Sequence, residues 1–75
     1  MFNKIIFGQR LRLLRKARNL SLKDVADSIG SLKSTIGNLE RGTKAPSIDM
    51  LLTLADFFDV SLDYLVGRSD DPRRY

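Results

Sequence analysis

The sequence contains no cysteine and no histidine. The absence of cysteine excludes disulfides and thiolate metal sites, and the absence of histidine removes the usual general base and the usual neutral metal ligand. No apolar run approaches the roughly twenty residues that span a membrane, and residues 1–7 are too short for a signal peptide. We therefore expect a cytoplasmic protein without a metal or cofactor, with catalysis the weakest of its possible functions.

The 75 residues suffice for one small domain, and their net charge of +4 is unevenly distributed. Residues 1–44 hold ten Lys or Arg against three acidic residues, whereas residues 45–71 hold one Arg against six Asp. A basic half of this kind attracts phosphate groups, although a run of charges is also typical of an ordinary solvated surface.

The spacing of apolar residues over 21–42 predicts two short helices joined by a tight turn. Gly30 and Gly42 are suited to end these helices because glycine adopts the left-handed conformation without steric cost. Two amphipathic helices around a glycine are typical of a helix-turn-helix, and equally of a plain helical hairpin with a solvated polar face. The apolar positions are Val25, Ala26 and Ile29 in the first helix and Ile36 and Leu39 in the second.

Short motifs follow one another in order and at constant spacing along residues 7–67. They are Leu20-Ser21, Asp24-Val25-Ala26, Ser34-Thr35-Ile36, Leu39-Glu40-Arg41-Gly42, Pro46-Ser47, Leu54-Ala55 and Val60-Ser61-Leu62-Asp63. Together they resemble the Cro/repressor-type (Xre-like) helix-turn-helix family. The resemblance implies an all-α, compact five-helix repressor-like domain in which the second and third helices form the helix-turn-helix.

Apolar periodicity also predicts a first helix over about residues 7–18 and a fourth over about 48–58, with Ile48 on its inner face. Residues 1–7 are either a frayed arm or an added turn of the first helix. Ser61 is expected to cap a fifth helix, with Leu62 turned inward. We therefore divide the chain into a helix-turn-helix domain at 1–67 and a flexible polar tail at 68–75.

The resemblance implies that the outward face of the third helix reads base edges in the DNA major groove. Lysine can donate to guanine, and asparagine can form two hydrogen bonds with adenine. A glycine leaves a gap or admits a thymine methyl. The residues concerned are Lys33, Ser34, Gly37 and Asn38.

Contacts to the DNA backbone are implied for Ser21, Lys23, Thr35, Arg41, Thr43 and Lys44. The loop over residues 41–47 could equally be an ordinary polar turn. The sequence departs from the family at Leu22, where many members have glutamine, and at the reversed pair Ser31-Leu32. We expect Ser31 to cap the third helix one residue early and Leu32 to turn toward the core.

Two further roles are predicted away from the DNA. The resemblance implies a largely buried ion pair between Arg15 and Glu40, because a half-buried carboxylate needs a partner and a guanidinium can supply two parallel bonds. Several apolar residues exceed what a small core needs, and either form a dimer surface or simply pack against one side of the core. These residues are Met50, Leu52, Phe57, Tyr64 and Val66.

The leading hypothesis is sequence-specific binding of double-stranded DNA by a transcriptional regulator, a repressor, acting as a homodimer on a near-palindromic operator. The alternative is a protein-interaction module that retains the fold with weak or no specific DNA binding; Leu22, Gly37 and the reversed pair Ser31-Leu32 favour it slightly. No small-molecule ligand is evident from the sequence.

Overall fold

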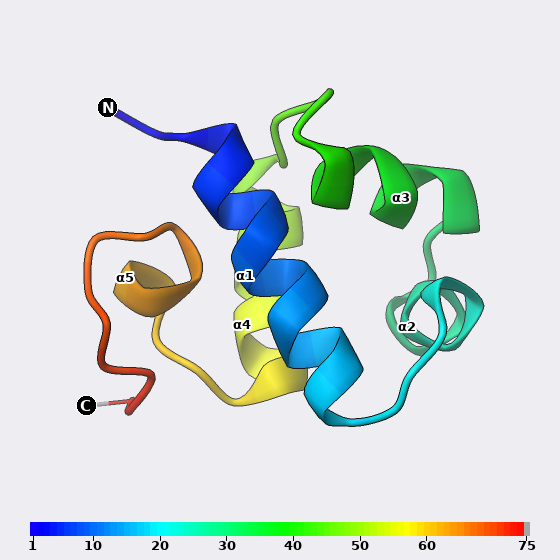
Figure 1. Ribbon diagram of the computed structural model, residues 1–75. Helices are drawn as coiled ribbons and strands as arrows, with labels where there is room; N and C mark the ends of the chain where they lie inside the picture. Colours follow the sequence, from blue (N-terminus) through cyan, green and yellow to red (C-terminus); the bar gives the residue numbers. More distant parts are fainter. Residues whose placement is uncertain (75) are drawn as a thin grey trace.

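The computed structural model describes residues 1–74, and these residues form five α-helices and no strand (Figure 1). The predicted all-α fold with five helices is confirmed. Helix α1 crosses the centre of the domain, and α2 and α3 lie on the side opposite α5 and the C-terminal segment. The helices are α1 (Lys4–Ala17), α2 (Leu22–Ile29), α3 (Lys33–Arg41), α4 (Ile48–Phe58) and α5 (Leu62–Leu65).

Helix α1 begins three residues before the predicted start at residue 7. Asn3 is its N-cap, and the side-chain oxygen of Asn3 accepts hydrogen bonds from the amides of Ile5 and Ile6, both at 3.0 Å. A side-chain acceptor at this position satisfies amides that have no partner within the helix. Of the two possibilities for residues 1–7, the added turn is therefore the one observed.

The core is made by side chains from every helix. It is closed at one end by Val60, between α4 and α5. The predicted inward positions Ile48 and Leu62 are wrong, since these side chains are 73% and 41% exposed. Ile48 begins α4 in line with exposed Leu52, four residues later, so both lie outside the inward stripe. The buried core residues are Phe7, Leu11, Val25, Ala26, Ile36, Leu39, Leu54, Ala55, Phe58, Val60 and Leu65.

Gly8 permits a close approach of α1 to α3, the helix on which α1 packs most extensively. A Cβ atom at Gly8 would lie 2.5 Å from the carbonyl oxygen of Glu40 and 2.6 Å from that of Leu39. Both neighbours are main-chain atoms, which cannot rotate away. The absence of a side chain at Gly8 therefore determines how deeply α3 is seated.

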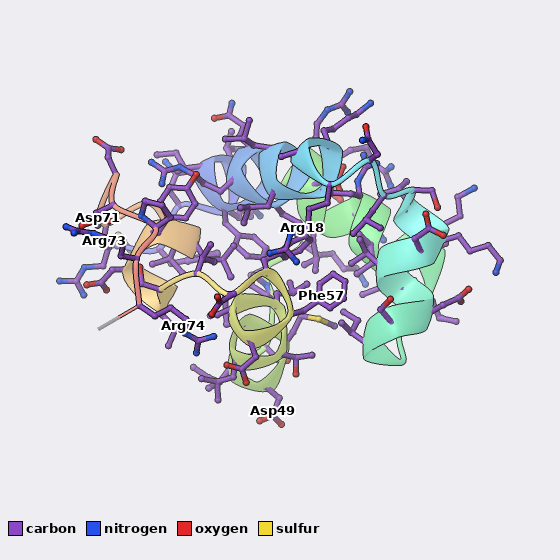
Figure 2. The ribbon with its side chains drawn as sticks, turned by 90° about the horizontal axis from the view of Figure 1, so that it is seen from below. Arg18, Asp49, Phe57, Asp71, Arg73 and Arg74 are labelled. Atoms are coloured by element: carbon purple, nitrogen blue, oxygen red, sulfur yellow. The ribbon has the colours of Figure 1, made fainter. Side chains whose placement is uncertain are left out.

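Arg10 of α1 and Arg18, the C-cap of that helix, bind backbone carbonyls of distant segments. Arg18 donates to the carbonyls of Phe57 and Phe58 at 3.1 and 2.8 Å, and Figure 2 shows it directed toward the end of α4. These carbonyls lie at a helix C-terminus, where a cation is favourable. Arg10 donates to the Tyr64 carbonyl at 3.0 Å and lies over the Tyr64 ring. Arg10 and Arg18 therefore serve the fold rather than the positive surface.

The segment after α5 is packed against the helices, where composition predicts a flexible tail. The amide of Ser61 donates to the carbonyl of Pro72, and Arg10 donates to the carbonyl of Ser69, both at 3.0 Å. Arg74 bridges back to α4, with hydrogen bonds to the Ala55 carbonyl and the Asp56 carboxylate (Figure 2). Several polar groups of this segment therefore bond to the domain, while most of its side chains are exposed. Tyr75 lies outside the described residues.

No helix within residues 1–74 is long and apolar enough to cross a membrane.

Candidate nucleic-acid interface

Helix α2 begins with a capping box. The Ser21 hydroxyl accepts from the amide of Asp24 at 3.0 Å, and the Asp24 carboxylate accepts from the amide of Ser21 at 2.9 Å. The hydrogen bond that the Ser21 backbone amide donates to the Asp24 carboxylate is the main cause that holds the pKa of Asp24 below its usual value. The Ser21 hydroxyl is thus occupied, and any anion at this end would be bound by the first-turn amides of Leu22 and Lys23.

The Lys23 side chain, predicted to contact the DNA backbone, is paired with Asp27 one turn later at 2.6 Å. The hydrogen bond with Asp27 raises the pKa of Lys23. Both side chains are well exposed, so the pair is weak and its lysine can exchange partners.

The turn between α2 and α3 differs from the prediction at Ser31 and Leu32. Gly30 takes the left-handed conformation, with φ of 71°, and the amide of Ser31 donates to the Ala26 carbonyl at 2.8 Å. Ser31 therefore closes the end of α2 and does not cap α3. Leu32 is the N-cap of α3, makes no side-chain cap and is 69% exposed, so the expected inward turn of Leu32 is wrong. Helix α3, which was predicted to read base edges, begins at Lys33.

Helix α3 has one face in the core and one face outward. Ile36 and Leu39 are buried, whereas Lys33 and Ser34 near its start are exposed, and Thr35 and Asn38 are half-buried. These four polar side chains, all of which were predicted to contact DNA, are therefore accessible at the molecular surface.

The gap expected at Gly37 is filled. Gly37 is buried although it faces outward, because the guanidinium of Arg41 lies over it: a Cβ at Gly37 would be 3.1 Å from Nη1 of Arg41. The Nη2 group of Arg41 also donates to the side-chain oxygen of Asn38 at 2.6 Å. Sequence reasoning missed this contact, although the spacing of four and three residues along one helix could have indicated it.

The segment after α3 turns sharply at Gly42, with φ of 73°. The amide and hydroxyl of Thr43 both donate to the Asn38 carbonyl at 3.1 Å, so Thr43 closes the helix end. Lys44 is exposed and follows directly. A shallow groove separates α3 from this loop; its lining residues are Thr35, Asn38, Leu39, Lys44, Ala45, Pro46, Ser47 and Met50.

Arg15 and Glu40 form the predicted ion pair, which joins α1 to α3. Nε and Nη2 of Arg15 donate to the two carboxylate oxygens of Glu40 at 2.6 and 3.0 Å, and both side chains are less than 10% exposed. Nη1 donates to the Leu20 carbonyl at 2.9 Å. The hydrogen bond with Glu40 raises the pKa of Arg15. The two-point contact fixes the orientation of α3 on α1.

The five residues predicted as a dimer surface are unequally placed. Met50, Phe57 and Tyr64 are partly buried and pack against the core. Val66 is half-buried, and Leu52 is 45% exposed. Packing within the domain thus accounts for three of the five residues. The large apolar side chains that α4 exposes to solvent are those of Leu52 and of Ile48, one turn earlier.

This arrangement of α2, a glycine turn and an outward α3 defines a helix-turn-helix protein. The helix-turn-helix family HTH_3 matches residues 11–65, and the chain belongs to this family. Over 67 residues it is 46% identical to the uncharacterised HTH-type transcriptional regulator YobD of Bacillus subtilis (strain 168). The match covers 89% of this chain and 60% of YobD, so the chain spans under two thirds of that relative.

Solved structures of the same family share the fold. The restriction-modification controller protein C.AhdI from Aeromonas hydrophila superposes with a TM-score of 0.77 at 37% identity, covering 87% of this chain and 98% of C.AhdI. The DNA-binding domain of BldD from S. venezulae gives a TM-score of 0.74 at 29% identity, covering 88% and 99% of the two chains.

Proposed function

We propose that this chain binds double-stranded DNA sequence-specifically and regulates transcription as a repressor. The observation that carries the proposal is the outward face of α3, where Lys33, Ser34 and Asn38 are accessible at the surface of a helix seated firmly by Arg15 and Glu40. In a helix-turn-helix such a face enters the major groove and its first residues meet base edges. The relationship to HTH-type regulators and to a DNA-binding domain supports the same function.

Backbone contacts would flank the reading helix on two sides. The first-turn amides of α2 suit one phosphate, with Lys23 close by once it leaves Asp27. On the other side, Thr35 and Lys44 line the same groove beside α3, where the second strand of phosphates would run. These contacts position the protein and carry no sequence information of their own.

We further propose that two copies bind a near-palindromic operator, with half-sites about ten base pairs apart. The exposed pair Ile48 and Leu52 on α4 supports an apolar contact between copies, because two large apolar side chains one turn apart are costly to leave in water. Leu52→Glu would place a charge in that contact. We expect it to lower operator affinity and to leave the folded monomer intact.

Selection from a random duplex pool at moderate salt tests the proposal directly. We expect enrichment of an inverted repeat, and affinity for it that falls by orders of magnitude between about 50 and 200 mM salt. Lys44→Ala should weaken binding, and Arg68→Ala is the matched control, since it removes the same charge from an exposed position shortly after α5, a helix that lies opposite α2 and α3 (Figure 1). A folded chain that enriches no duplex would instead support the protein-interaction module.

A further inference from the structure

The guanidinium of Arg41 lies on the reading face of α3 and not along the loop that follows it. It extends back by one turn, toward the helix start, as long side chains on helices do. Its Nη1 group covers Gly37 and its Nη2 group binds the side-chain oxygen of Asn38 at 2.6 Å. Any side chain at position 37 would compete for this space, so Gly37 and Asn38 together make a seat for Arg41.

This seat changes what Asn38 can offer to a base. A guanidinium has only donors, so the oxygen of the Asn38 amide must face it, and the same oxygen lies 3.5 Å from the Thr43 hydroxyl. Recognition of adenine by asparagine needs that oxygen as the acceptor for the adenine amino group. With the oxygen engaged, Arg41 and Asn38 present N–H donors to the outside.

A surface of donors complements a base edge made of acceptors. In the major groove guanine presents two adjacent acceptors, N7 and O6, whereas adenine presents one acceptor and one donor. The planar fork of arginine matches the guanine pair with two parallel bonds, and lysine cannot reproduce this geometry. A guanidinium already held on the reading face also loses less side-chain freedom when it binds.

We propose that Arg41 is a base-reading residue that recognises a guanine, with Gly37 providing its space and Asn38 orienting it. The proposal rests on the DNA-binding function above and replaces two expectations from the sequence, a backbone contact for Arg41 and adenine recognition by Asn38. Lys44 remains a contact to phosphate. One G·C pair in each half-site is therefore recognised from the C-terminal half of α3.

The test compares variants on the operator that the wild-type chain selects and on duplexes with each G·C pair replaced in turn. Arg41→Ala should abolish discrimination at one G·C pair, about 5- to 150-fold in the wild type, and leave discrimination elsewhere unchanged. Arg41→Lys retains the charge and should lose the same discrimination. Lys44→Ala should weaken all duplexes by one common factor.

Gly37→Ala is the more informative variant, because we expect it to raise the stability of the fold and to lower discrimination at the G·C pair. Alanine is the better helix former, so we expect the thermal midpoint to rise by about 4 °C. Its methyl carbon would lie 3.1 Å from Nη1, closer than ordinary contact, so the guanidinium must shift and discrimination at the same G·C pair should fall.

An equal loss on all duplexes for Arg41→Ala would make Arg41 a backbone contact and overturn the inference while leaving DNA binding intact. Retained guanine preference in Gly37→Ala would overturn the role of the seat. A wild-type chain that selects no operator would overturn the proposed function itself, and this inference with it.

Discussion

The substitution Gly8→Ala tests whether α1 and α3 are in contact through their backbones. In the middle of α1, alanine is the better residue by roughly 1 kcal/mol on helix propensity alone. The structure predicts the opposite result. The new Cβ would lie 2.5 Å from the Glu40 carbonyl oxygen, and Cβ atoms essentially never approach other atoms below 3.0 Å. The two helices would have to separate by about half an ångström.

The loss of stability caused by that separation depends on the side chains of α1 that share a face with Gly8. Leu11 and Arg15 follow Gly8 on the same face of α1, so the shift opens the core at Leu11 and stretches the 2.6 Å bond from Arg15 to Glu40. Overpacking of this kind costs about 1–3 kcal/mol. Less the gain of about 1 kcal/mol in helix propensity, the net loss is near 1 kcal/mol, which lowers the thermal midpoint of a domain of this size by about 6 °C.

Thermal unfolding followed by circular dichroism measures the effect, and Gly37→Ala is the matched control. Gly37 is also inside a helix, but its nearest neighbour is the end of the flexible Arg41 side chain, which can move aside. We expect the midpoint to fall for Gly8→Ala and to rise for Gly37→Ala. If both variants shift the midpoint in the same direction, the reasoning about the close approach is refuted.

Three further predictions concern the ion pair, the cap and the DNA contacts. Glu40→Ala leaves the buried guanidinium of Arg15 without its carboxylate, so urea unfolding should show a loss of about 3–5 kcal/mol, and an unchanged midpoint would exclude a structural role for the pair. The pKa of Asp24 is lower in the folded chain than its usual 3.8, so its contribution to stability is complete above that pH and is lost as the pH falls through the folded pKa. Asp24→Asn should therefore reduce the loss of thermal stability on acidification below 3.8, and identical acid profiles would contradict the capping role. In binding titrations, Asn38→Ala should cost about 1–3 kcal/mol on the operator and relax preference at the G·C pair assigned to Arg41, because Asn38 orients that guanidinium, whereas Lys44→Ala should weaken specific and random duplexes alike; equal losses for Asn38→Ala would exclude this orienting role.

Local signals in the sequence identify the helix-turn-helix correctly. Ser21 and Asp24 form their capping box within three residues of one another, and Gly30 and Gly42 end α2 and α3 in the left-handed conformation. Such features depend on a few neighbouring residues and need no knowledge of the rest of the fold. The Arg15–Glu40 pair is not local, and its prediction came from the family resemblance.

Other features depend on how distant segments meet. The packing of residues 68–74 depends on carbonyls and carboxylates from α4 and α5, which no local pattern relates to a polar tail. Leu32 suits an inward position by its chemistry, yet the turn that Ser31 completes leaves it outside.

The sequence by itself determined the two helices of the helix-turn-helix and the residues at which α2 and α3 end, because periodicity, caps and glycine act over one or two turns, and its family resemblance supplied the five-helix fold. Only the tertiary structure decided which cations are available to DNA. Arg10, Arg15 and Arg18 are engaged within the domain, whereas Arg41 lies on the outward face of α3. The physical reason is that a guanidinium binds whichever acceptors the packed helices bring within its reach, and that choice is made only when α1, α3 and α4 have met.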